Sequence, residues 1–336
     1  MSELESKTET NADTGASSPT APHAPEFTVA SQPSYMQTLF LGPDGLRPGW
    51  GFAFYVTTFY ILERWVANYA SSLNLGYSGL WSNLLEEFGV LVAAILPSLV
   101  LARVEHRPWR FYGLPGTQAF GRRFWLGTIW GFAAISLLML LLSGVHVFAL
   151  GNIVLHGARL LRFAAFWAVM FLLVGFFEEF LLRGYSQFTL TRGIGFWPAA
   201  IVLSCTFGLI HLRNEGEQWT GALAAAAIGL FFCLTLRRTG NLWFAVGFHA
   251  AWDWGETFFY SVPDSGLVAP GHLFKSSLHG PSWLSGGTVG PEGSVVCFVV
   301  IALACLAFDR VYPKSLTGTI SSMHVADKAA GSHFGS

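Results

Sequence analysis

The sequence predicts an all-α polytopic membrane protein, with about eight transmembrane helices and a four-helix catalytic core. Hydrophobic residues make up 52% of the chain and charged residues only 12%, whereas a soluble domain carries about 25% charged residues. Apolar runs of membrane-spanning length recur along the chain from about residue 50 to residue 308. The net charge of −1 and the lack of a basic run exclude nucleic acid as an expected partner.

Composition divides the chain into three regions. Residues 1–34 are acidic and rich in Ser, Thr, Pro and Ala, so we expect a disordered N-terminal tail. They lack the basic n-region and the apolar core of a signal peptide. Residues 35–310 form the predicted transmembrane domain, with the catalytic core at about 163–260, and residues 311–336 form a flexible C-terminal tail.

Hydropathy places the eight spans in order along the chain. They are expected at about residues 50–69, 88–104, 124–150, 163–185, 196–214, 219–236, 241–260 and 294–308. The first span carries Glu63 and Arg64, and the last is shorter than the roughly 20 helical residues that cross a bilayer.

The distribution of basic residues predicts the orientation of these spans. Most of them fall on the side shared by both termini, including the group Arg103, Arg107, Arg110, Arg122 and Arg123. The positive-inside rule therefore predicts cytoplasmic termini, with the Gly- and Pro-rich loop at about 261–293 on the outer side. The composition of the N-terminal tail favours a bacterial inner membrane.

The fourth predicted span contains two adjacent carboxylates, Glu178 and Glu179. An acidic residue at the centre of a membrane costs about 2.5–3.5 kcal/mol on insertion scales, so it indicates a functional site. Glu179 and Arg183 are four residues apart and share a helix face, and their ion pair lowers the cost of burying both. Residues five apart diverge by about 140° around the axis, so Glu178 is left free for chemistry.

Two later spans add imidazoles and a third acid. His211 ends the fifth span, and His249 and Asp253 lie four residues apart on one face of the seventh. We expect Glu178, His211, His249 and Asp253 to converge on one polar cavity, whereas Glu256 either shares that face or is a helix-end acid.

The two histidines lie at different predicted depths. Counted from the cytoplasmic ends of their spans, His211 lies further into the membrane than His249. For the two to meet, we predict that the fifth span starts later than its apolar pattern suggests, with Pro198 near its first turn.

Three motifs, in order along the chain, carry a resemblance to a known family. Glu178-Glu179-xxx-Arg183, Phe207-xxx-His211 and His249-xxx-Asp253 resemble the motifs of the CPBP family of intramembrane proteases, which includes the type II CAAX prenyl endopeptidases, bacteriocin-processing proteins and Abi proteins. The resemblance implies a helical membrane peptidase that acts on a membrane-associated peptide or protein at the lipid bilayer. The eukaryotic relatives imply a prenylated CAAX C-terminus as substrate.

The resemblance also implies roles for single residues. Glu178 would be the general base that activates water, with help from His211, and His249 and Asp253 would stabilise the tetrahedral oxyanion. Many relatives carry Asn where this chain has Asp253, and an ionised Asp cannot donate a hydrogen bond. Asp253 is therefore either protonated, or it orients His249, or the site binds a metal.

The sequence leaves alternatives for both the cofactor and the function. Three protein ligands suffice for a catalytic zinc, so Glu178, His211 and His249 would hold Zn²⁺ in a metalloendopeptidase, and the alternative is catalysis without a cofactor. Besides an endopeptidase, the same residues would suit a catalytically silent membrane scaffold or immunity-type protein, or a proton- or metal-coupled transporter.

Overall fold

The computed structural model describes residues 34–42, 45–72, 80–266 and 270–313. Residues 1–39 and 40–336 form two separate units, and helix α1 (Tyr35–Phe40) begins in the first of them. The predicted tails, 1–34 and 311–336, lie almost entirely outside the described residues. The second unit carries everything discussed below.

The second unit is built from helices, as the sequence predicts. These are α2 (Pro48–Ser72), α3 (Leu80–Val104), α4 (Arg122–Gly144), α5 (Gly157–Leu181), α6 (Gln187–Ile194), α7 (Phe196–His211), α8 (Trp219–Thr239), α9 (Trp243–Trp254), α10 (Ser282–Ser285) and α11 (Val295–Val311). Two short antiparallel strand pairs accompany them, β1 (Leu41–Gly42) with β2 (Gly45–Leu46) and β3 (Phe148–Ala149) with β4 (Ser277–Leu278).

Four helical segments are long and apolar enough to cross a membrane. They are Leu80–Val104, Arg122–Gly144, Gly157–Ile194 and Trp219–Thr239, and they indicate an integral membrane protein. The other predicted spans fall on α2, α7, α9 and α11. Of these, α7, α9 and α11 are shorter than the roughly 20 residues of a standard span, so the total of eight stays a prediction.

Two expectations about helix ends are wrong. The third span was expected to continue to about residue 150, but α4 ends at Gly144 and the chain enters β3, with Val147 and Phe148 buried. A short apolar run cannot distinguish a strand from the end of a helix. The fifth span was expected to start late, but α7 begins at Phe196, where the apolar pattern begins, with Pro198 in its first turn.

The start of α9, and not that of α7, explains how His211 and His249 reach the same depth. The start of α9 is buried beneath the chain segment that precedes α4. The backbone N–H of Leu242 donates to the Gly113 carbonyl at 2.8 Å, and Trp243 Nε1 donates to the Pro115 carbonyl at 3.2 Å. Because α9 begins inside the protein, two helical turns are enough to bring His249 to the depth of the cavity described below.

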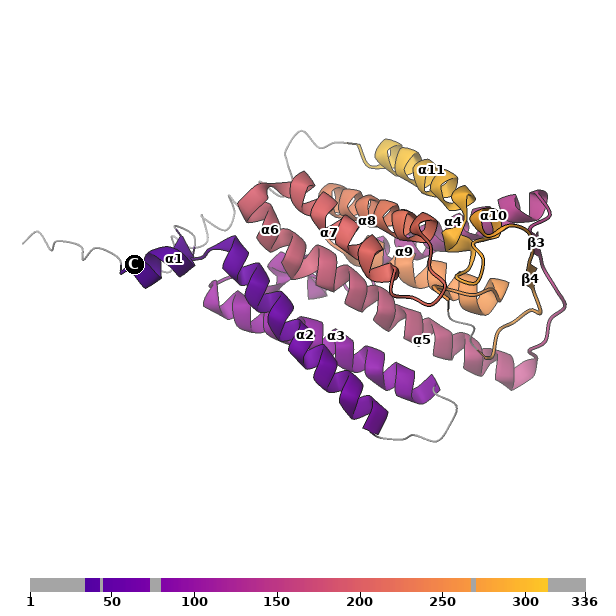
Figure 1. Ribbon diagram of the computed structural model, residues 1–336, viewed down its shortest axis with the longest axis horizontal. Helices are drawn as coiled ribbons and strands as arrows, with labels where there is room; N and C mark the ends of the chain where they lie inside the picture. The colour runs from indigo at the N-terminus through magenta and orange to yellow at the C-terminus, as the bar shows by residue number, and fades with distance from the viewer. Residues whose placement is uncertain (1–33, 43–44, 73–79, 267–269, 314–336) are drawn as a thin grey trace, which may run out of the picture. The chain divides into compact units, whose positions relative to one another are not determined.

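Helix α5 is central to the arrangement of the second unit. It packs against α3 on one side and α9 on the other (Figure 1). At its C-terminal end it continues into a π-helical turn, Leu182–Ser186, where Gly184 has non-helical dihedrals of φ −81° and ψ −119°. Such a turn kinks the helix axis. Beyond the kink, α6 packs against α2 and α7.

Glycines bring α4 and α9 into backbone contact. A Cβ atom added at Gly131 of α4 would overlap the carbonyl of Phe248 on α9, and one added at Gly247 of α9 would overlap the carbonyl of Phe124 on α4. Small residues at such crossings let membrane helices approach closely. The contact therefore fixes the position of α9 against α4 and leaves no room for a larger side chain.

We predict that Gly131→Ala lowers the stability of the protein by about 1–3 kcal/mol, the usual effect of overpacking a close contact. Thermal unfolding of the purified protein in detergent measures this. Gly144→Ala is the matched control, because Gly144 ends the same helix and an added Cβ there meets no atom within 4 Å. Equal unfolding temperatures for the two variants would contradict the proposed close contact.

Candidate active site

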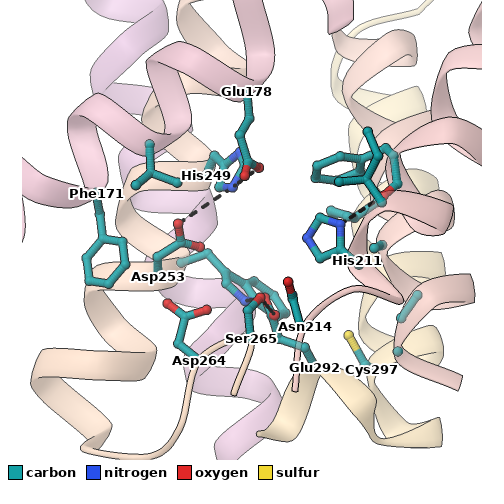
Figure 2. A pocket seen from close by; sticks show the side chains of 18 of the residues that line it. Phe171, Glu178, His211, Asn214, His249, Asp253, Asp264, Ser265, Glu292 and Cys297 are labelled. Atoms are coloured by element: carbon teal, nitrogen blue, oxygen red, sulfur yellow. Dashed lines mark hydrogen bonds and ion pairs between the residues drawn. The ribbon is translucent and has the colours of Figure 1, made fainter. Parts of the chain in front are cut away.

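A cavity of about 300 Å³ opens between α5, α7, α8 and α9. Its polar lining comes from several elements and comprises Glu87, Glu178, His211, Asn214, Glu217, His249, Asp253, Asp264, Ser265 and Glu292. All four predicted site residues are among them. Figure 2 shows Glu178, His249 and Asp253 on one wall and His211 on the facing wall. The structure thus brings the predicted residues to one cavity, as expected.

Beside this cavity lies a fully buried ion pair. Arg183 Nη1 donates to Glu179 Oε1 at 3.0 Å, so the predicted contact between residues four apart is present. The guanidinium also lies over two aromatic rings, 4.7 Å from the centroid of Phe207 and 5.8 Å from that of Phe232, which adds cation–π attraction. Helix α8 makes room for it at Gly229, where an added Cβ would overlap Arg183 Nη2.

His249 is surrounded by three carboxylates. Its Nδ1 lies 3.1 Å from Glu179 Oε1, and its Nε2 lies 3.5 Å from both Glu178 Oε2 and Asp253 Oδ2. Because Glu179 is paired with Arg183, its carboxylate accepts a hydrogen bond, and Nδ1 of His249 carries the proton. The ring is thereby held with Nε2 toward the cavity carboxylates.

The hydrogen bond of His211 determines which of its ring nitrogens is free. Nδ1 lies 2.8 Å from the carbonyl oxygen of Phe207, one turn earlier on α7. A carbonyl can only accept, so Nδ1 is the donor and the neutral ring keeps its lone pair on Nε2. The Phe207 ring packs edge-to-face against the imidazole at 4.4 Å and fixes its plane. His211 therefore offers the cavity an acceptor.

Sequence reasoning missed several polar residues of this cavity. It did not predict that Glu179 contacts His249, because these residues lie on different helices and no local spacing relates them. It also missed Asp264, which follows α9, and Glu292, which precedes α11. Burial raises the pKa of Asp264 well above its ordinary value, and the nearby Asp253 and Glu292 raise that pKa further.

Glu217 lies in the loop between α7 and α8 and also lines the cavity. Its pKa is raised, chiefly by partial burial.

The three residues of the zinc alternative do not form a ligand group. In the described part of the chain, the potential ligand atoms that gather within 4.8 Å of one another belong to Asp253, Asp264 and Glu292. Glu178, His211 and His249 do not gather in this way, with His211 on the opposite wall (Figure 2). They therefore do not fit a zinc site with three protein ligands.

Together, these features define a class of protein: a helical membrane protein in which carboxylates and imidazoles on apolar helices share one cavity. Residues 160–255 match the family model described as Type II CAAX prenyl endopeptidase Rce1-like. The chain thus contains a domain of this CPBP family, which confirms the resemblance and indicates an intramembrane protease. No curated protein and no solved structure matches the chain.

We predict that Arg183→Ala destabilises the protein by about 3–5 kcal/mol, because it leaves Glu179 as a buried charge without its partner. Thermal unfolding of the purified protein measures the change. Arg64→Ala is the control: it removes the cation of the Glu63–Arg64 pair on α2, where the Arg64 side chain is 57% exposed and the loss of stability should be small. A similar small effect for both variants would show that the buried pair contributes little.

Proposed function

We propose that this protein is an intramembrane endopeptidase that hydrolyses a peptide bond with a water molecule activated by Glu178. The contrast between two neighbouring carboxylates supports the proposal most directly. Glu179 is fully buried against Arg183, whereas the side chain of Glu178 is 24% exposed and lines the cavity beside His249. A carboxylate that is open to water and close to an imidazole is suited to general base catalysis.

Glu178 would handle the proton in both halves of the reaction. It takes a proton from water as the water oxygen forms a bond to the carbonyl carbon of the substrate. It then gives that proton to the leaving amine as the carbon–nitrogen bond breaks, which restores the carboxylate. His211 Nε2 would accept a hydrogen bond from the other O–H of the water and so hold the water molecule between the two walls.

His249 would stabilise the oxyanion, and Asp253 would position its ring. Glu179 fixes the proton on Nδ1 of His249, so a second proton on Nε2 makes this nitrogen a donor toward the cavity. Such a donor lowers the barrier by about 2.7–4 kcal/mol. Asp253 Oδ2 lies 3.5 Å from Nε2, which favours the alternative in which Asp253 orients the ring.

The proposed substrate is a membrane-associated peptide. The description of the matched family names prenyl endopeptidases, so we propose a peptide with a prenylated CAAX C-terminus as the first substrate to test. The apolar part of the lining supports a lipid-like group beside the scissile bond, since it includes Met170, Phe171 and Ile228. We further propose eight spans in a bacterial inner membrane, with both termini in the cytoplasm.

We predict that Glu178→Gln lowers the cleavage rate of a farnesylated CAAX peptide by about 10²–10⁴-fold, the usual contribution of a general base. Peptide cleavage by the purified protein is followed by mass spectrometry, with an unprenylated peptide alongside. Glu86→Gln on α3 is the control, because it neutralises a carboxylate outside the cavity lining.

Three results of this assay would count against parts of the proposal. Full activity of Glu178→Gln would remove Glu178 from the chemistry. Failure of the folded wild-type protein to cleave either peptide would favour the silent scaffold or the transporter. Equal cleavage of both peptides would leave the peptidase but remove the preference for a prenyl group.

The proposed orientation predicts that residue 275 faces the outside of the cell. In a background without the native cysteines, Lys275→Cys should react with a membrane-impermeant maleimide in intact cells, and Arg110→Cys should react only after lysis. Both positions are exposed on the protein surface, so access depends on the side of the membrane. The reverse pattern would invert the topology.

A further inference from the structure

Three carboxylates meet at one end of the cavity. Asp253 on α9, Asp264 in the following loop and Glu292 in the turn before α11 offer oxygen atoms that all lie within 4.8 Å of one another. Figure 2 shows Asp264 and Glu292 at the end of the cavity below Asp253. The side chains of Asp253 and Asp264 are buried and that of Glu292 is half-buried. Like charges this close together repel strongly away from bulk water.

A fourth carboxylate, that of Glu256, lies close to this group. Glu256 is fully buried, and neither of its oxygens has a partner of normal hydrogen-bond geometry, since the nearby indole N–H of Trp252 donates to Glu292 instead. It lies three residues after Asp253, so the two share a face. Its Oε1 lies 3.0 Å from the position of a Cβ on Gly290, two residues before Glu292, and its charge interacts with those of Glu292, Asp264 and Asp253. A buried carboxylate without a partner needs a cation or a proton.

Neutral donors orient these carboxylates but do not balance their charge. Thr257 Oγ1 donates to Asp264 Oδ2 at 3.1 Å, Ser265 Oγ donates to Glu292 Oε2 at 3.3 Å, and Trp252 Nε1 donates to Glu292 Oε1 at 2.9 Å. Hydrogen bonds of this kind orient the ligands of metal sites. Among the described residues, no lysine or arginine forms an ion pair with any of the four carboxylates.

We propose that Asp253, Asp264 and Glu292 bind a divalent cation, Ca²⁺, with Glu256 as an additional negative charge beside it. A site made only of oxygen ligands selects hard cations. Ca²⁺ takes six to eight oxygens at about 2.3–2.6 Å, so ligands on opposite sides of it lie about 5 Å apart, and the separations within 4.8 Å between these atoms are compatible with its coordination shell. Mg²⁺ demands near-ideal octahedral geometry at about 2.0–2.1 Å and usually keeps several waters, so a group of three protein carboxylates favours Ca²⁺.

The cation would act on two parts of the protein. It joins the two ends of the chain segment 264–292 to α9. It also binds Asp253, whose Oδ2 lies 3.5 Å from Nε2 of His249. Asp253 is the only proposed ligand inside the segment that matches the family model, because Asp264 and Glu292 lie beyond residue 255. Binding of the cation does not depend on whether the protein is a peptidase.

The test measures Ca²⁺ binding to the purified full-length protein. Tb³⁺ replaces Ca²⁺ in oxygen sites and emits when a nearby tryptophan is excited, and the indole of Trp252 contacts Glu292. We expect saturable Tb³⁺ emission that Ca²⁺ displaces, one ion per chain by calorimetry, and a higher unfolding temperature in Ca²⁺ than in a chelator.

Two variants locate the site and one serves as the control. Asp264→Asn and Glu292→Gln should each weaken Ca²⁺ binding at least tenfold and abolish the Ca²⁺-dependent rise in unfolding temperature. In the chelator both should be as stable as the wild type or more so, because each removes a like charge. Glu215→Gln neutralises an exposed loop carboxylate outside the group and should bind Ca²⁺ normally.

Three results would overturn the proposal. One is the absence of saturable Tb³⁺ or Ca²⁺ binding by the folded wild-type protein. Another is unchanged binding in both variants. The third is a wild-type unfolding temperature that does not respond to Ca²⁺, which would mean that the carboxylates lose their charge by taking up protons. The wild-type measurements decide the question even if a variant fails to accumulate.

Discussion

The buried contact between Glu179 and Arg183 connects the helices on which the site stands. Removing either charge alone would leave the other buried without compensation in a region of low dielectric. The loss of one partner is therefore strongly destabilising. Arg183 lies against Phe207 of α7 and Phe232 of α8, and Glu179 accepts from His249 of α9. One ion pair on α5 and its continuation therefore contacts each of the three helices that face it around the cavity.

This arrangement explains why two adjacent carboxylates have different surroundings. Helical geometry turns Glu179 toward Arg183 and turns Glu178 away from it. Oε1 of Glu179 contacts both Arg183 and His249, whereas the side chain of Glu178 lines the cavity. The close contact between α4 and α9 also matters, because it fixes the backbone of α9, which carries the imidazole of His249 that Glu179 contacts. Precise placement of the imidazole then depends on packing as well as charge.

The sequence predicts those parts of the structure that depend on local periodicity. It predicts the helices and the pairing of Glu179 with Arg183, because both follow from spacing along one element. It also predicts that Glu178, His211, His249 and Asp253 share a cavity, because isolated polar residues on apolar helices must face one another. It does not predict where α9 begins, since a buried helix start is set by the contacts of Leu242 and Trp243 with a distant segment.

The sequence does not predict where the carboxylates beyond α9 lie, because a long loop has no regular residue spacing. Asp264 and Glu292 lie at opposite ends of a Gly-rich segment, and only its folded path brings both to Asp253. An Asn at position 253 would add no charge there, and its amide could donate to an oxyanion directly. Asp253 instead brings a negative charge, which needs positively charged neighbours. His249 lies on one side and the carboxylates of Asp264 and Glu292 lie on the other, where the proposed cation would balance their charge. Asp253 therefore adjoins both the imidazole and the carboxylates of the loop.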